Sequence, residues 1–305
     1  MPRARFLVVC LNPVIQNTLV FGHVREGEVN RSSEHRVDAS GKGVNVARVL
    51  GQTGQRAVHL SQLGGPTRDW FLSMCAADGI DARWAESRSE IRICTTVVDR
   101  GARSATELVQ EARMVGEGTF ERVLAEFERA LPDCEAVVLS GTKAAGFPEE
   151  AMPALAQGAA RSGKALFLDL KGADLLACLP FRPVIAKPNL EELIHTFARG
   201  TSLRGEDQLA AKDFVASVGR DFAESYGASL VVTRGRNSTW YWSGSALREC
   251  PALEVEALNP IGSGDSFMAG LASTLMEGAF LDEAVAEGTR LGALNAQRLK
   301  PGSIA

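Results

Sequence analysis

The sequence lacks the features that membrane proteins and nucleic-acid-binding proteins need. No apolar run in its 305 residues approaches the roughly 20 residues that span a bilayer, and the apolar stretch 5–11 is too short for a signal peptide. Lysine and arginine number 33 against 37 aspartates and glutamates, and this net charge of −4 does not suit a nucleic-acid binder. We therefore expect a cytoplasmic protein that binds neither membranes nor nucleic acids.

Cysteine and histidine are also scarce. The six cysteines contain no CxxC pair, and the four histidines do not cluster with them. We therefore expect neither a zinc site nor a disulfide framework, and we interpret the cysteines as ordinary buried thiols.

Short apolar runs alternate with longer helical stretches along most of the chain. The runs are apolar almost throughout, which is typical of strands that are covered on both faces of a mostly parallel sheet. The predicted strands are 5–10, 57–61, 136–140, 165–170, 183–186 and 229–233, and the predicted helices are 44–53, 67–78, 117–130, 148–162, 189–198, 206–226, 265–278 and 281–298. This alternation predicts one open α/β domain over residues 1–305.

Two regions interrupt this alternation. Residues 17–38 and 83–109 contain short pieces with the period-2 pattern of a sheet that has one exposed face, and no convincing helix. We interpret them as two excursions that form a small lid sheet together. The alternative is a pair of surface loops that never pair.

The most informative segment runs from Asn259 to Asp265, with the sequence NPIGSGD, directly before an apolar helical stretch. Gly262 and Gly264 let the backbone approach a ligand closely, and the N–H groups of the following helix start favour phosphate oxygens. Asp265 can accept the proton of an attacking hydroxyl. The alternative is a glycine turn in which Asp265 only begins the helix. The segment is not a P-loop, because no GxxxxGK[ST] motif occurs in the sequence.

A second glycine motif opens the helix that follows residue 40. Gly41 and Gly43 allow close contact with a substrate, Lys42 can meet an anionic group, and Asn45 offers both a donor and an acceptor to sugar hydroxyls. The alternative is a plain turn from loop to helix.

Together, SGKGVNVAR at 40–48 and NPIGSGDSFMAG at 259–270 resemble the pfkB family of ribokinase-like carbohydrate kinases. LNP at 11–13, followed by GEVN at 27–30, resembles the phosphofructokinase and tagatose-phosphate kinase branch, and the likeness covers essentially the whole chain. The resemblance implies a Rossmann-like α/β core with a small β-sheet lid, and ATP and Mg²⁺ as cofactors.

The resemblance also implies roles for individual residues. Asp265 becomes the catalytic base, and Gly262, Ser263 and Gly264 line the anion hole. The expected substrate contacts are Asn12, Gln16, Gly41, Lys42, Gly43, Asn45 and, for a phosphate already on the sugar, Arg92. The expected nucleotide contacts are Lys187, Asn189, Thr233, Gly235 and Asn295. Glu192 is expected to act on the metal indirectly, and Asp169 is a weaker metal candidate.

One departure from the family pattern concerns the substrate. Gln16 stands where the family commonly carries an aspartate that contacts sugar hydroxyls, and Ser40 replaces the first glycine of GGKG. Neither change touches Asp265 or its glycines, so phosphoryl transfer is expected to be intact while the identity of the sugar is open.

The leading hypothesis is an ATP-dependent kinase of a hexose phosphate, with fructose 1-phosphate or a related ketohexose phosphate as the first candidate. A kinase of an unphosphorylated sugar or a nucleoside, and a sensor that binds ligands without catalysis, are the alternatives. A nicotinamide-dependent dehydrogenase is excluded, because GxGxxG does not follow the first strand. A homodimer formed through the lid is a further hypothesis, because an exposed sheet often needs a covering partner.

Overall fold

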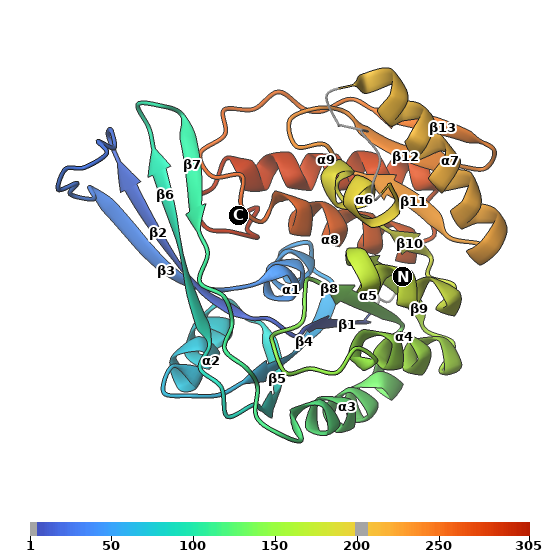
Figure 1. Cartoon of the computed structure of the whole chain (residues 1–305), viewed down its shortest axis with the longest axis horizontal. Coiled ribbons are helices and arrows are strands. Elements are labelled where there is room, and N and C mark those ends of the chain that lie inside the picture. The colour runs from blue at the N-terminus through green and yellow to red at the C-terminus, as the bar shows by residue number, and fades with distance from the viewer. Residues whose placement is uncertain (1–4, 199–206) are drawn as a thin grey trace.

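The computed structural model describes residues 5–198 and 207–305, which form a nine-stranded sheet covered by helices and a separate four-stranded sheet (Figure 1). The large sheet has the order β13-β12-β11-β10-β9-β8-β1-β4-β5. Its strands are β1 (Arg5–Cys10), β4 (Arg56–Leu63), β5 (Asp81–Glu86), β8 (Ala136–Ser140), β9 (Ala165–Asp169), β10 (Ile185–Ala186), β11 (Ser229–Val232), β12 (Thr239–Ser243) and β13 (Ala246–Cys250). All pairs from β5 to β11 are parallel, and β12 and β13 add an antiparallel edge.

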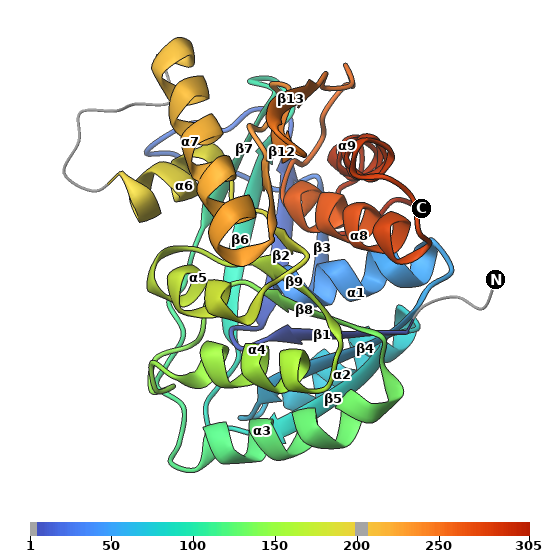
Figure 2. The same cartoon turned by 90° about the vertical axis from the view of Figure 1, so that its right-hand side faces the viewer.

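The helices cover both faces of the large sheet (Figure 2). They are α1 (Lys42–Gln52), α2 (Arg68–Ala77), α3 (Thr119–Ala130), α4 (Ala151–Arg161), α5 (Gly172–Cys178), α6 (Leu190–Phe197), α7 (Gln208–Tyr226), α8 (Ser263–Met276) and α9 (Leu281–Ala296). In β1, Leu7 and Val9 pack with α3 to α7, whereas Phe6 and Val8 pack with α1, α2, α8 and α9. The continuous apolar character of β1 follows from this double burial. Among the described residues, no helix has the length and apolarity that would span a bilayer.

The four-stranded sheet is the predicted lid, and its order is β3-β2-β6-β7. Its strands are β2 (Val14–Phe21), β3 (Glu34–Ser40), β6 (Arg92–Asp99) and β7 (Ser104–Leu108). Arg92 stands in register with Val14, which in turn pairs with Ser40. Paired residues point to the same face of a sheet, so Arg92 and Ser40 share the face that turns toward the pocket described below. The pairing of 17–38 with 83–109 therefore holds in outline, and the alternative of unpaired surface loops is wrong.

The range predicted for the second excursion, 83–109, begins too early. Residues 81–86 form β5, which pairs in parallel with β4 at the edge of the large sheet rather than in the lid. The burial of β5 alternates because an edge strand is covered incompletely, so its period-2 pattern matches that of the lid strands. Strand β13 and the short helix α5 were also missing from the predicted elements.

The topology places a ligand site at the carboxyl ends of β1 and β8. From β1 the chain proceeds to β4 and β5 on one side, and it then returns to β8 on the other side of β1. Open α/β sheets bind ligands at such a switch point, where the flanking connections diverge.

Candidate active site

The start of α8 forms an anion-binding turn. Gly262 has φ +86°, a conformation that favours glycine, and a Cβ there would lie 2.3 Å from the backbone nitrogen of Gly302. The first turn of α8 comprises Ser263, Gly264 and Asp265. Ser263 N donates to Pro260 O at 3.1 Å, so the helix-start N–H groups of Gly264 and Asp265, with the partial positive charge of this helix end, suit an anion. Gly264 is exposed, so the turn is open to a ligand.

Asp265 is buried directly beside this turn. Its side chain is 6% exposed, and Asn45 Nδ2 donates a hydrogen bond of 2.8 Å to Asp265 Oδ2. Burial raises the pKa of Asp265 to about 6; Lys42 opposes this shift and Asp169 adds to it. A carboxylate with this pKa is largely ionised at neutral pH and can still hold a proton, as a general base must.

Two lysines converge on the second buried carboxylate of the site, Asp169. Its Oδ1 lies 3.2 Å from Lys42 Nζ and 3.3 Å from Lys187 Nζ. Burial alone would raise the pKa of Asp169, but Lys187 and Lys42 outweigh it and hold this pKa below its ordinary value. Lys187 Nζ also lies 3.8 Å from the place that a Cβ of Gly264 would occupy, so it reaches the anion-binding turn.

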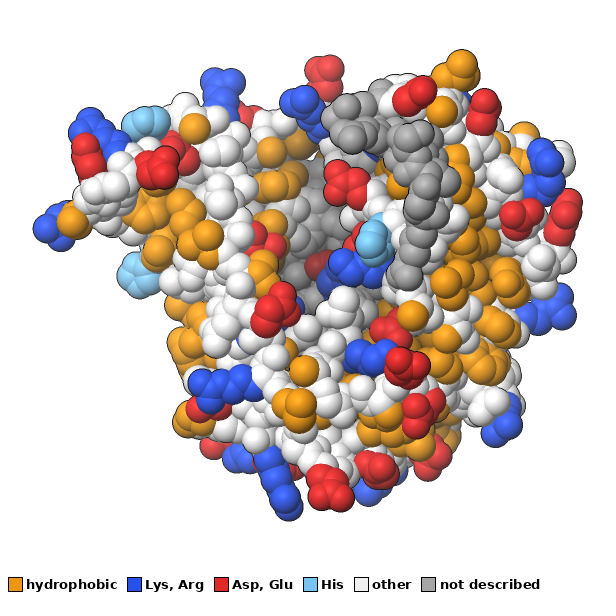
Figure 3. All heavy atoms as spheres, in the orientation of Figure 1, with side chains coloured by type: hydrophobic (Ala, Val, Ile, Leu, Met, Phe, Trp, Pro, Cys, Tyr) orange, Lys and Arg blue, Asp and Glu red, His pale blue; other side chains and the backbone are white. Residues whose placement is uncertain are grey.

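A pocket opens in front of these residues. It is lined by the ends of β1, β8 and β9, by Lys42 at the start of α1, by Glu192 of α6 and by Arg92 of the lid. Figure 3 shows the molecule hollowed between the lid and the main body on this face. The pocket thus brings the predicted substrate residues Asn12, Lys42 and Arg92 together with the metal candidates Asp169 and Glu192, from segments far apart in the sequence.

Two polar atoms at the pocket wall have no hydrogen-bond partner within the described residues. They are Arg92 Nε and Asn12 Oδ1, both buried. The amide nitrogen of Asn12 donates to Thr142 Oγ1 at 3.1 Å, which leaves its oxygen as an acceptor. A free donor and a free acceptor in one pocket fit a ligand that carries both hydroxyl and anionic groups.

Residues 8–304 match the sequence profile of the pfkB family carbohydrate kinases. The chain belongs to this family. A pfkB kinase is a phosphotransferase that phosphorylates an alcohol group of a sugar, and this assignment agrees with a buried carboxylate beside an anion-binding turn.

Solved structures show the same fold for this pfkB kinase. Phosphofructokinase-2 from Escherichia coli in complex with fructose-6-phosphate has a TM-score of 0.82 at 22% identity, over 99% of this chain and 96% of that chain. A possible 1-phosphofructokinase from Thermotoga maritima has a TM-score of 0.86 at 19% identity, over 97% and 93%. The tetrameric inhibited form of phosphofructokinase-2 from Escherichia coli has a TM-score of 0.80 at 22% identity, over 97% and 94%.

The predicted nucleotide residues of the kinase lie on two neighbouring segments. Asn189 begins α6 and accepts from Glu192 N at 2.8 Å, while Glu192 Oε2 accepts from Asn189 N at 3.1 Å. Thr233 forms an isolated parallel bridge with Asn189. Gly235 follows with φ +60° and is exposed, with open space around its Cβ position.

Asn295 occupies a different place from the one predicted. Its side chain is fully buried; its Nδ2 donates to Ile261 O and Ser263 Oγ, and its Oδ1 accepts from Ser303 N. These bonds engage both amide hydrogens and the oxygen, so the side chain supports the anion-binding turn from behind instead of offering a hydrogen bond to a nucleotide.

Two predicted substrate residues are also less accessible than expected. Gln16 is 1% exposed and donates from Nε2 to Thr96 Oγ1 at 2.9 Å, and Asn45 is 2% exposed. Gly43 has a packing reason, because a Cβ there would lie 2.6 Å from Cys10 Cβ. Gly41 has φ +107° and would place a Cβ 3.3 Å from Pro13 Cα. The second glycine motif thus seats α1 tightly on the end of β1.

Sequence reasoning missed three residues at or behind this site. Thr142 and Lys171 line the pocket, and Lys171 Nζ lies 4.0 Å from Glu192 Oε1. Arg48 is buried behind Asn45. Its position three residues after Asn45 on one predicted helix was the available signal, since residues so spaced lie on one helical face.

Proposed function

We propose that the kinase transfers the γ-phosphate of ATP to a hydroxyl of a phosphorylated ketohexose, with fructose 1-phosphate as the first candidate. The unpartnered, buried Nε of Arg92 on the pocket face of the lid supports an anionic substrate more than any other observation. A planar guanidinium matches the oxygens of a phosphate that the sugar already carries. The solved phosphofructokinase structures, at under 25% identity, support the kinase fold of this chain. The assay described below identifies the sugar.

In the proposed reaction, the substrate hydroxyl oxygen forms a bond to the γ-phosphorus while the bond from that phosphorus to the β–γ bridging oxygen breaks. Asp265 accepts the hydroxyl proton, and ADP leaves. The N–H groups of the first α8 turn, together with Lys187, stabilise the charge that develops on the phosphoryl oxygens. Closure of the lid would exclude water from the pocket, so that the sugar rather than water receives the phosphoryl group.

The carboxylates present fit an indirect role toward Mg²⁺. No group of three or more acidic, histidine or cysteine side chains that could hold a metal occurs among residues 5–198 and 207–305. Mg²⁺ in kinases is typically bound by substrate phosphates, waters and one or two carboxylates. Glu192 and Asp169 would help to hold the ion indirectly, and the ion would neutralise phosphate charge when bound.

The first experiment measures ADP release with Mg-ATP and a panel of fructose 1-phosphate, fructose 6-phosphate, tagatose 6-phosphate, free hexoses and nucleosides. Arg92→Met should raise KM for a phosphorylated sugar by at least about tenfold, because a charge-assisted contact is lost. Arg113→Met is the matched control, because Arg113 is 65% exposed and pairs with Glu90. Equal KM values for wild type and Arg92→Met on every active sugar would contradict the phosphorylated substrate. Activity on free sugars or nucleosides alone would favour the first alternative, and ATP binding without turnover would favour the sensor.

We also propose a homodimer through the lid, in a cytoplasmic enzyme. Ile93 and Leu108 lie on the lid face opposite Arg92 and are 43% and 57% exposed, so this face offers apolar surface to a second copy. Light scattering at micromolar concentration should give a dimer mass, and Ile93→Lys should lower it to that of a monomer. A monomer mass for the wild type would contradict this assembly.

A further inference from the structure

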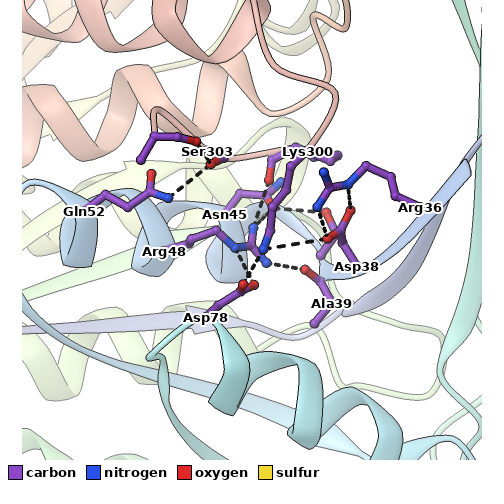
Figure 4. Close-up of polar contacts among 12 residues, drawn as sticks. Arg36, Asp38, Ala39, Asn45, Arg48, Gln52, Asp78, Lys300 and Ser303 are labelled. Atoms are coloured by element: carbon purple, nitrogen blue, oxygen red, sulfur yellow. Dashed lines mark hydrogen bonds and ion pairs between the residues drawn. The ribbon is translucent and has the colours of Figure 1, made fainter. Parts of the chain in front are cut away.

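A fully buried arginine lies one helical turn behind Asn45. The Arg48 side chain is 1% exposed, and its guanidinium donates to Asp78 Oδ2 at 2.8 Å, Asn45 Oδ1 at 3.0 Å, Pro301 O at 2.9 Å and Ala39 O (Figure 4). A buried cation is costly unless it is paired and its donors are used. Arg48 thereby ties together α1, the end of α2, the base of the lid and residues 300–303.

The chemistry of these partners decides how the Asn45 amide is oriented. A guanidinium can only donate, so the atom of Asn45 that faces Arg48 must be the oxygen. Ser40 Oγ also donates to this oxygen, at 3.0 Å. The amide nitrogen is left facing Asp265 Oδ2 at 2.8 Å, and an ionised carboxylate can only accept. Arg48, Asn45 and Asp265 therefore form a chain of hydrogen bonds with one consistent direction.

The same arginine holds the turn at Pro301 and Gly302, which packs against both Asn45 and the anion-binding turn. A Cβ on Gly302 would lie 2.3 Å from Asn45 Cβ, and a Cβ on Gly262 would lie 2.3 Å from Gly302 N. The bond from Arg48 to Pro301 O fixes this turn where it touches Asn45 on one side and the anion-binding turn on the other.

We propose that Arg48 is a positioning residue for Asp265: it fixes the Asn45 amide so that its N–H, and not its oxygen, faces the carboxylate. This inference rests on the proposed function, in which Asp265 is the base. The charged groups that face Asp265 are Lys42 from α1, Asp169 from β9 and Lys187. None of these three accounts for the Asn45 hydrogen bond, so Arg48 contributes separately.

The test titrates Asp265 directly and needs no turnover. Full-length protein with ¹³C-labelled aspartate carboxyls is titrated by NMR, and Asp265→Asn assigns the resonance. Arg48→Met should raise the Asp265 midpoint by about one pH unit, because the amide is no longer held as a donor to the ionised form. Asn45→Leu, which leaves Arg48 with Asp78 and the two carbonyls, should raise it similarly.

Two controls separate orientation from other effects. Gln52→Met removes contacts from the same helix to the same terminal turn, where Gln52 bonds Ser303 Oγ at 3.1 Å and Ile304 N at 2.8 Å, and should leave the midpoint unchanged. In an Asn45→Leu background, Arg48→Met should add no further shift. A further shift there would mean that Arg48 acts on Asp265 by a route other than the Asn45 amide, and would overturn the proposal.

An unchanged midpoint in folded Asn45→Leu would also overturn the proposal, whether or not Arg48→Met folds. If the wild type phosphorylates nothing in the sugar panel while these shifts occur, the proposed substrate class fails and the positioning of Asp265 by Arg48 stands.

Discussion

Asp169 at the end of β9 and Asp265 at the start of α8 are two buried carboxylates of one site, and their pKa values move in opposite directions. Both are buried, at 1% and 6% exposure. Asp169 has a lowered pKa because two lysine ammonium groups lie within 3.3 Å, whereas Asp265 has a raised pKa because burial outweighs its neighbours. The contrast shows that neighbours, and not residue type, separate a structural anion from a group that can exchange a proton.

Removal of the proton-accepting member should give the largest effect. Asp265→Asn keeps the shape of the side chain but cannot take a proton, so kcat/KM should fall by about 10³-fold or more. Initial rates with the sugar that the panel identifies measure the loss. Circular dichroism of the variant serves as the control for folding, and a folded variant with near wild-type activity would remove Asp265 from the role of base.

Removal of one of the two lysines beside Asp169 should destabilise the protein, because the charge of this buried carboxylate is then less well compensated. Lys187→Met leaves a buried carboxylate with one partner fewer, so the free energy of unfolding at pH 7 should fall by about 2–3 kcal/mol, measured by urea denaturation. Because folding lowers the pKa of Asp169, its carboxylate stabilises the folded state at pH values above its unfolded-state pKa. This stabilisation is lost as the pH falls through the folded-state pKa. The difference between wild type and variant should therefore shrink in acid.

The matched control for this experiment is Lys171→Met. Lys171 is 52% exposed and lies 4.0 Å from Glu192, so its loss should hardly change stability. Equal destabilisation by both substitutions would show that the buried Lys187–Asp169 pair contributes no more to the free energy of unfolding than the exposed Lys171–Glu192 pair.

The raised pKa of Asp265 implies the opposite pH dependence of stability. Asp265 stabilises the folded state fully at pH values below its unfolded-state pKa of 3.8. This stabilisation is lost as the pH rises through its folded-state pKa of about 6. Asp265→Asn stays uncharged at all these pH values, so it should be more stable than wild type by about 2 kcal/mol at pH 7.5, and by much less at pH 4. Urea denaturation at the two pH values measures this. A variant that is less stable than wild type at pH 7.5 would contradict it.

Removal of an exposed ion pair should give the smallest effect on the free energy of unfolding. Comparison with Lys187→Met then shows how much of that effect depends on burial. Arg100, directly after β6, lies 2.9 Å from Glu34 of β3 in the lid, and both side chains are about half exposed at 52% and 50%. Arg100→Met should change the free energy of unfolding by less than about 0.5 kcal/mol. A loss as large as that of Lys187→Met would mean that this lid contact matters beyond its exposure.

The core of the fold and the two glycine motifs were predictable from local pattern. Strands such as β1, apolar on both faces, and α8 behind Gly262 need only neighbouring residues to be recognised. The edge strand β5 was assigned to the wrong sheet, because incomplete covering gives it the same alternation as a lid strand. Local pattern carries no information on which partner strand lies beside it.

The network behind the site could not be predicted for a related reason. Asn45 and Asp265 are 220 residues apart, and Arg48 and Pro301 are 253 apart. A charged residue on a helix is usually solvated, and only the packing of α1 against α2, the lid and the terminal turn encloses Arg48. The burial of Gln16 follows from the β2–β6 pairing in the same way.

The turn at Pro301 and Gly302 has a consequence for synthesis on the ribosome. Arg48 emerges early in translation, but one of its acceptors and the residue that packs against Asn45 belong to positions 301 and 302. Until those residues have left the exit tunnel, a nascent chain lacks the contacts that complete the surroundings of Asn45. The surroundings of Asn45, which donates to the proposed base Asp265, are therefore completed late as the protein is made.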